Sequence, residues 1–313
     1  INGAIGFMVF KDHNPACPAA ERYKATSRTK TPDESGTLIH AMSLFASPDG
    51  FHWSVKQHRI ITDGEFDALN QIFWDSFRQR YVVFYRDAAY GLPGGGYRGA
   101  DGYRAIATAV SSDALTWSDG SLLEYGDAPK EQLYDPAIVA YHRAPHLFVG
   151  FPLRYLPHRG APGSTHKWSE VSDVLFMTSR NGRHWRRWRE AFLRPGPQIG
   201  QPEHYRWGGH CNNMAVGVIV ETASDTPGAP NELSIYSTEG YYIGKSSQLR
   251  RYTLRLDGFV ALLSAVTPML EETGVELHME TDLGPQVWSS ALARAPHPMI
   301  KVCYDIGDRA SLG

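Results

Sequence analysis

A turn signature recurs three times along the chain at nearly constant spacing, and it constrains the fold more than any other feature. The copies begin at Ser47, Ser111 and Ser179, and each has Asp or Asn two residues later and Trp six residues later. The three Trp residues, at positions 53, 117 and 185, are 64 and 68 residues apart. A repeat of this length, built from short β-runs, corresponds to about one four-stranded blade of a β-propeller. A looser fourth copy occupies residues 256–259.

The residue types in this signature have a structural explanation. Asp or Asn accepts a hydrogen bond from the backbone two residues on, and Gly tolerates a positive φ, so that the chain reverses tightly. The Trp that follows buries a large apolar face. We therefore interpret the signature as structural and use it to align the repeats.

Between the turns lie short runs rich in Val, Ile, Tyr and Phe, as expected of strands that are covered on both faces. The alignment predicts first strands at 5–10, 67–74, 135–141 and 213–220, second strands at 22–26, 81–85, 146–151 and 232–236, and third strands at 39–45, 103–110, 174–177 and 249–254. We predict an all-β fold, a five-bladed β-propeller with four-stranded antiparallel blades. The whole chain, 1–313, is expected to form one domain with blades at about 1–63, 64–130, 131–200 and 201–262, and 263–313 as a closing blade or an irregular segment.

Composition excludes several classes of partner. The formal net charge is −2, and the one basic cluster, 183–189, is interpreted as a solvated edge strand, so we expect no nucleic acid. No apolar run approaches 18 residues, so we expect no membrane span. The three Cys residues lack metal-ligand spacing, and we expect no cofactor, with a structural cation in the channel as the alternative.

The given sequence starts at Ile1 rather than Met and shows no signal-like segment. We expect a trimmed or incomplete N-terminus, with a secreted or periplasmic location left open. The oligomeric state is not predicted.

In a propeller, the first strands begin at the channel mouth, and the second strands end there. This places Asp67, Asp135 and Asn212 or Asn213 together with Arg86 or Asp87, Arg154 and Glu239. By the same alignment Asp12 and Asp75 fall in hairpin turns at the opposite end, where we expect them to be turn residues.

Paired carboxylates in one cleft suit glycoside cleavage, because one carboxyl must be protonated while the other is charged. The predicted catalytic residues are Asp67, Asp135, Glu239 and Glu203, and either Glu could be the acid. The predicted carbohydrate-binding residues are Asn70, Arg86, Arg154, Arg206, Trp207, His210 and Asn213.

Several motifs resemble those of the five-bladed propeller glycoside hydrolases of families 32, 43, 62, 68 and 117. They are the Ser-x-Asp-x-x-x-Trp turns, the run Phe66-Asp67-x-x-Asn70-x-x-x-Trp74-Asp75, and Tyr134-Asp135-Pro136. The chain most closely resembles uncharacterised family-32-like bacterial proteins. The resemblance implies Asp67 and Asp135 with Glu203 or Glu239 as the catalytic carboxyls. The chain departs from family 32 in lacking its Trp-Met-Asn-Asp-Pro-Asn-Gly and Glu-Cys motifs.

The predicted function is therefore hydrolysis of a glycosidic bond in a furanoside or an acidic plant or algal glycan. The alternatives are a carbohydrate-binding propeller without catalysis, a sialidase-like enzyme, and a polysaccharide lyase that uses Tyr134, His210 and Arg154.

Overall fold

The computed structural model describes residues 5–160, 170–195, 214–239, 248–258, 277–280 and 300–303. Within these ranges every regular element is a strand, apart from the short 3-10 helix η1 (Ala19–Glu21). The chain divides into two compact units, one of Ile1–Ile219 with Ile235–Tyr252 and the other of Val220–Ser234 with Thr253–Gly313. No helix in the described part is long and apolar enough to cross a membrane.

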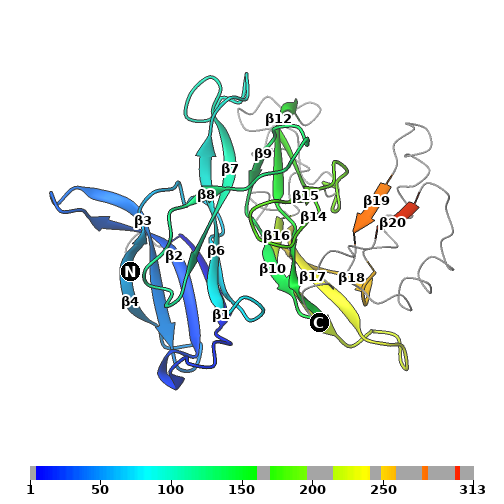
Figure 1. Cartoon of the computed structure of the whole chain (residues 1–313), viewed down its shortest axis with the longest axis horizontal. Helices are drawn as coiled ribbons and strands as arrows, with labels where there is room; N and C mark the ends of the chain where they lie inside the picture. The colour runs from blue at the N-terminus through cyan, green and yellow to red at the C-terminus, as the bar shows by residue number, and fades with distance from the viewer. Residues whose placement is uncertain are drawn as a thin grey trace, which may run out of the picture. The chain divides into compact units, whose positions relative to one another are not determined.

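Three four-stranded antiparallel sheets follow one another along the first unit (Figure 1). The first sheet contains β1 (Ile5–Lys11), β2 (Tyr23–Pro32), β3 (Leu38–Ser47) and β4 (Ser54–Ile61). The second contains β5 (Gln71–Asp75), β6 (Arg80–Ala89), β7 (Tyr103–Ser111) and β8 (Ser121–Leu122). The third contains β10 (Ile138–Tyr141), β11 (Ala144–Gly150), β14 (Met177–Ser179) and β15 (Arg186–Arg187). The prediction of an all-β fold with four-stranded antiparallel sheets is confirmed.

The remaining strands form smaller sheets. A three-stranded sheet contains β16 (Met214–Thr222), β17 (Glu232–Glu239) and β18 (Gln248–Arg255), and β19 (Leu277–Glu280) pairs in parallel with β20 (Ile300–Cys303). A further sheet, which the repeat did not predict, joins β9 (Gln132–Tyr134), β12 (Leu153–Gly160) and β13 (Glu170–Val174). The five-blade count, the blade boundaries and the single domain stay predictions.

The three repeated turns share one hydrogen-bond pattern. In the first copy, Ser47 Oγ accepts from Gly50 N at 2.9 Å, and Trp53 Nε1 donates to Gly50 O at 2.9 Å. Asp49 Oδ1 accepts from Phe51 N and His52 N, each at 2.8 Å. The other copies repeat these contacts. The fourth residue of each turn has a positive φ: +82° at Gly50, +65° at Ala114 and +82° at Gly182. The structural interpretation of the signature is therefore confirmed.

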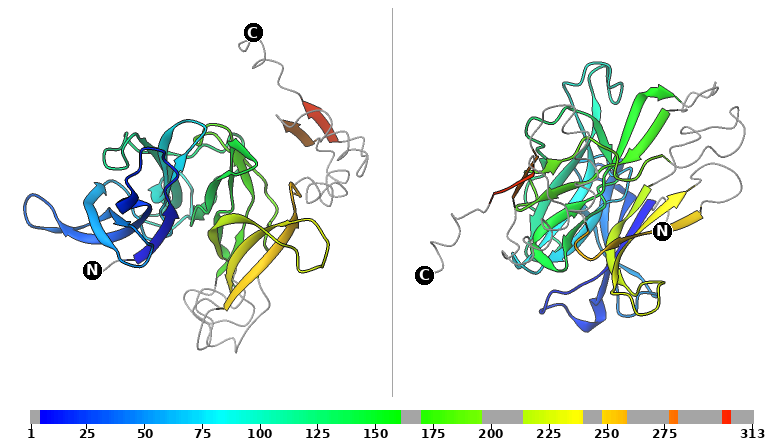
Figure 2. Two further views of the ribbon diagram at one scale, coloured as in Figure 1. Left: turned by 90° about the horizontal axis from the view of Figure 1, so that it is seen from below. Right: turned by 90° about the vertical axis from the view of Figure 1, so that its right-hand side faces the viewer.

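Strand β6 is covered on both faces because alternate side chains point to opposite sides. Val83 and Tyr85 pack with Met42 and Leu44 of the first sheet. Val82, Phe84 and their neighbours pack with the third sheet, where Trp185 is buried in the same cluster. The blue first sheet and the cyan second sheet lie next to each other in Figure 2, as this packing requires.

The first strands of the sheets converge on one buried amide, that of Gln71 in β5. Its Oε1 accepts a hydrogen bond from Ile138 N of β10 at 2.8 Å, and its Nε2 donates to Gly217 O of β16. A Cβ added at Gly217 would lie 3.2 Å from Met8 of β1, so β1 also approaches this point. Inner strands from four sheets therefore meet, which is the radial arrangement that the repeat predicts.

Two predicted strand starts are too early. Strand β5 begins at Gln71 rather than 67, and β10 begins at Ile138 rather than 135. Phe66, Asp135 and Ala137 have φ of +53°, +49° and +44°, values that a strand does not accommodate. Asp67 and Asp135 therefore lie in loops that enter the inner strands.

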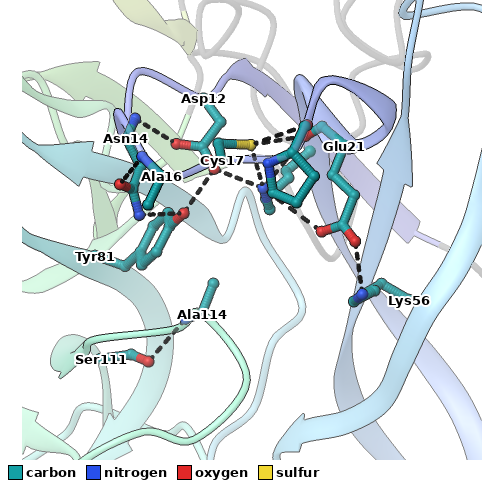
Figure 3. A network of polar contacts seen from close by, with 11 residues as sticks. Asp12, Asn14, Ala16, Cys17, Glu21, Lys56, Tyr81, Ser111 and Ala114 are labelled. Carbon is teal, nitrogen blue, oxygen red and sulfur yellow. Dashed lines mark hydrogen bonds and ion pairs between the residues drawn. The ribbon is translucent and has the colours of Figure 1, made fainter.

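Asp12 directly follows β1 and Asp75 ends β5, and the side chain of each accepts a backbone hydrogen bond from the turn that comes next, in agreement with the predicted turn role. Asp12 Oδ1 accepts from Asn14 N at 2.9 Å, and its Oδ2 contacts Lys24 Nζ at 2.6 Å and the Tyr81 hydroxyl at 2.7 Å (Figure 3). Asp75 Oδ1 accepts from Arg78 N at 3.1 Å. The buried Asp12–Lys24 ion pair lies within the first sheet, and the hydrogen bond from Tyr81 of β6 joins it to the second sheet.

The basic cluster 183–189 includes β15, which is the edge strand of the third sheet, as predicted. The expectation that it is solvated throughout is wrong for Arg187, which is buried and pairs with Glu131. Arg183, in contrast, is exposed and pairs with Glu124 at 2.8 Å.

We predict that Gln71→Met lowers the free energy of unfolding by about 2–4 kcal/mol. The side chain keeps its volume, but Ile138 N and Gly217 O lose their buried partner, at about 1–3 kcal/mol for each unsatisfied group. Urea unfolding measures the change, and Gln57→Met, at an exposed position of β4, is the control and should stay within about 0.5 kcal/mol of the parent. Equal stability of the two variants would contradict a structural role for the Gln71 amide.

Candidate functional site

The loop before β5 carries Asp67 and is fastened to the end of β6. Glu65 N and Phe66 N both donate to Arg86 O at 3.1 Å. The fully buried Asn70 side chain donates to Phe66 O at 2.8 Å and to Ala68 O at 2.9 Å, and it accepts from Arg86 N at 3.2 Å. These contacts indicate that Asn70 positions the loop, whereas its predicted contact with carbohydrate stays a prediction.

Two arginines flank the carboxylate of Asp67. Its Oδ1 lies 3.3 Å from Arg28 Nη1 and its Oδ2 lies 3.5 Å from Arg86 Nη1. The same Arg86 nitrogen donates to the backbone oxygen of Asp67. The Asp67 side chain is nevertheless 53% exposed, so its carboxylate is oriented by the protein and still accessible to a ligand.

Asp135 has the opposite environment. Only 4% of the residue is exposed, and its Oδ1 accepts a hydrogen bond from Leu69 N at 2.8 Å. Burial raises the pKa of Asp135 to about 6, although the Leu69 hydrogen bond and the charge of Arg86 act to lower it. The charge of Asp67 contributes to the increase. Asp135 is therefore mostly protonated below about pH 6.

The structure thus brings Asp67 and Asp135 together from two neighbouring sheets. The hydrogen bond from Leu69 N joins the two loops only two residues after Asp67. One carboxyl is buried and the other is accessible, and the two interact electrostatically. Carboxyl pairs whose environments push their pKa values apart are typical of acid–base sites.

Arg86, a predicted site residue, belongs to this cluster. It is 4% exposed, and its guanidinium carbon lies 5.0 Å from the ring centroid of Tyr97 and 5.5 Å from that of Tyr134. Within the described part of the chain, its Nε has no hydrogen-bond partner.

The sequence analysis missed four residues that line the cluster, namely Arg28, Glu65, Tyr97 and Arg104. Arg104 is the second residue of β7 and pairs with Ala88, which is near the end of β6. The alignment rule could have found it, since third strands start at the end where second strands finish. Arg28 was missed because β2 extends to Pro32, beyond the predicted end at 26.

Arg154 is held in a different network. Its Nη2 and Nε contact the two carboxylate oxygens of Asp173 at 2.7 and 2.9 Å, and its Nη1 contacts Glu131 at 3.0 Å. The residue lies in β12, opposite Leu133 of β9. These contacts fasten β12 to β13, and no contact of Arg154 with Asp67 or Asp135 is seen in the described part of the chain; its predicted role in binding stays a prediction.

The other predicted residues cannot be placed in this site. Glu239 ends β17, but its side chain lies outside the described residues. The rest lie wholly outside the described ranges: Glu203, Arg206, Trp207, His210 and Asn213. In the described part, no group of three or more His, Cys, Asp or Glu side chains has the arrangement of a metal site.

No protein-family model and no curated protein matches the sequence. Among solved structures, the fold is similar to that of the β-1,2-mannobiose phosphorylase from Listeria innocua, with 10% identity and a TM-score of 0.52, over 84% of this chain and 61% of that one. An N-acetylgalactosamine deacetylase from F. plautii is 14% identical with a TM-score of 0.44, over 69% and 59% of the two chains. The GH32 β-fructofuranosidase BmSUC1 from Bombyx mori is 9% identical with a TM-score of 0.43, over 76% and 49%.

The chain therefore spans about six tenths or less of the length of these three proteins. At such low identity the similarity to the phosphorylase concerns the fold alone. Together with the sheets described above, it identifies an all-β fold of the β-propeller type, as predicted. The similar structures include glycoside hydrolase-like propeller proteins, and the closer family-32-like assignment stays a prediction.

We predict that Asp135→Asn alters how stability depends on pH. A carboxyl with a raised folded-state pKa stabilises fully below its unfolded pKa of about 4, and this contribution is lost as the pH rises through about 6. Between pH 4 and pH 7, the free energy of unfolding of the wild type should therefore fall by up to about 3 kcal/mol more than that of the variant. Asn retains the acceptor for Leu69 N and tolerates the positive φ.

Urea unfolding across this pH range tests the prediction. The control is Asp127→Asn, at an exposed position, which should follow the wild-type curve. Parallel curves for the wild type and Asp135→Asn would show that Asp135 has an ordinary pKa.

Proposed function

We propose that this protein is a carbohydrate-active enzyme that cleaves the glycosidic bonds of a glycan, with Asp67 and Asp135 as its paired carboxyls. One observation carries the proposal: two loops from adjacent sheets, joined by the Leu69–Asp135 hydrogen bond, present a buried carboxyl of raised pKa beside an accessible carboxylate. Glycoside cleavage needs one carboxyl that gives a proton to the leaving oxygen and one that acts as a nucleophile or base.

The environments suggest how the roles divide. Asp135 holds a proton up to about pH 6 and is the acid among the described residues. Asp67, between Arg28 and Arg86, is the charged partner that attacks the anomeric carbon or activates water. Glu203 and Glu239 are the alternative acids, as the resemblance to family 32 implies. The substrate is a furanoside or an acidic glycan.

The names of the similar structures agree with work on carbohydrates. They include a mannobiose phosphorylase, a β-fructofuranosidase and a deacetylase that was solved with a blood group trisaccharide. This agreement supports the class of substrate, whereas the reaction and the catalytic residues rest on the site geometry.

We predict that Asp67→Asn and Asp135→Asn both reduce hydrolysis of native glycans, by about 10²- to 10⁴-fold for loss of the acid. The two variants should differ on aryl glycosides with a good leaving group, such as dinitrophenol, which departs without protonation. There Asp135→Asn should recover most of the lost rate, and Asp67→Asn should not.

The pH profile of kcat/KM provides the second readout. The acid must be protonated, so activity should fall as the pH rises above about 6, and Asp135→Asn should remove this limb. The control is again Asp127→Asn, which should keep wild-type rates. Full turnover of native glycan by both variants would remove these residues from catalysis.

A polysaccharide lyase is the second candidate, because Tyr134 lies beside two arginines. The guanidinium carbons of Arg86 and Arg104 are 5.5 and 5.8 Å from its ring centroid. Lyase chemistry uses a Tyr or His base while a cation neutralises the uronate carboxylate. Its product would carry a double bond that absorbs in the ultraviolet, whereas hydrolysis gives only a new reducing end.

A further inference from the structure

The guanidinium groups of Arg86 and Arg104 lie against the same tyrosine rings, and Arg86 contacts Asp67. The guanidinium carbons of Arg86 and Arg104 lie 5.0 and 4.7 Å from the ring centroid of Tyr97, and both also lie within 6 Å of that of Tyr134. Tyr155 lies 4.6 Å from the Arg104 guanidinium carbon. Because Arg104 pairs with Ala88, two residues after Arg86, both arginines project from the same face of the second sheet.

Carboxylates neutralise the positive charges of Arg86 and Arg104 less closely than those of neighbouring arginines. Arg104 Nη1 donates to the neutral amide oxygen of Gln132, and no carboxylate pairs with Arg104 among the described residues. Arg86 is buried, its Nε has no hydrogen-bond partner among the described residues, and its Nη1 lies 3.5 Å from the Asp67 carboxylate. Burial and the charge of Arg86 lower the pKa of Arg104, as expected for two neighbouring cations.

Other arginines nearby are neutralised by close carboxylates. Arg98, which also contacts the Tyr97 ring, pairs with Glu65 at 2.5 Å. Arg154 pairs with Asp173 at 2.7 Å and with Glu131 at 3.0 Å. Arg104 differs from Arg98 and Arg154 in having no carboxylate partner among the described residues.

We propose that Arg86 and Arg104, with Tyr97 and Tyr134 around them, bind an anionic substituent of the glycan, a carboxylate or a sulfate ester. A planar guanidinium donates several hydrogen bonds in a fixed geometry that matches such oxygens, and aromatic faces hold its plane. The inference rests on the proposed function, and it narrows the substrate from a furanoside or an acidic glycan to an acidic one.

The position next to Asp67 gives the site a role in orientation. Arg86 contacts both Asp67 and the proposed anion, so a bound acidic sugar would lie beside the accessible carboxylate. Because Arg86 then compensates two negative groups, Arg104 supplies the second positive charge. Neutral glycans cannot make this contact, so we expect them to bind with lower affinity.

Calorimetric titration tests the proposal with three probes at constant ionic strength: digalacturonate, a sulfated galactose disaccharide and inorganic phosphate. We expect one or both acidic sugars to bind the wild type and to bind Arg104→Gln at least tenfold more weakly. Arg98→Gln is the matched control, since Arg98 contacts the same ring but is exposed and paired; its affinity should stay within twofold.

Two further measurements keep the test decisive. Circular dichroism melting checks that Arg104→Gln folds, and Arg104→Lys, which keeps the charge without the planar group, should bind with intermediate affinity. Failure of both acidic sugars to bind, equal weakening in Arg98→Gln, or binding of phosphate alone would overturn the proposal.

The outcome separates this inference from the proposed function, because binding is measured without turnover. Cleavage of a neutral glycan by a protein that binds none of the probes would overturn the anion site alone. Binding of an acidic sugar that depends on Arg104, without cleavage of any glycan, would support the anion site and overturn the enzyme proposal.

Discussion

The Gln71 amide is the contact on which the arrangement of the site depends. It joins the inner strand β5 to β10 through Ile138 N and to β16 through Gly217 O, at a point that β1 also approaches. Inner strands fixed at one point bring the loops that precede them to one place. Asp67 and Asp135 are 68 residues apart in the chain, and they meet because each lies just before such a strand.

Burial and neighbouring charges then give the carboxyls of Asp67 and Asp135 different environments. Asp135 is removed from water and keeps a single backbone donor, so burial dominates and its pKa rises. Asp67 is accessible and lies between Arg28 and Arg86. Arg86 contributes to both environments and also extends the positive charge toward Arg104, so that cleavage and recognition of an acidic substrate would share one residue.

Sequence reasoning predicted the elements that repeat and missed those that occur once. The turns were found because Ser, Asp and Trp recur at fixed offsets, and their contacts match in all three copies. The β9–β12–β13 sheet lies within one repeat and has no counterpart to align with. Phe66 and Asp135 have positive φ values, and their loops are held by hydrogen bonds to Arg86 O and from Leu69 N, which sequence patterns do not reveal. Tyr97 was missed because it lies in an irregular loop. Arg104 was missed because the starts of the third strands were not considered as site positions.

The most direct measurement is the titration of the Asp135 carboxyl itself. Carbon-13 NMR of protein labelled at the aspartate carboxyl carbon would follow each resonance with pH, and loss of one resonance in Asp135→Asn would assign it. The structure predicts a midpoint near pH 6 for Asp135. A midpoint near 4, the usual value for an exposed aspartate, would contradict the buried acid on which the account rests.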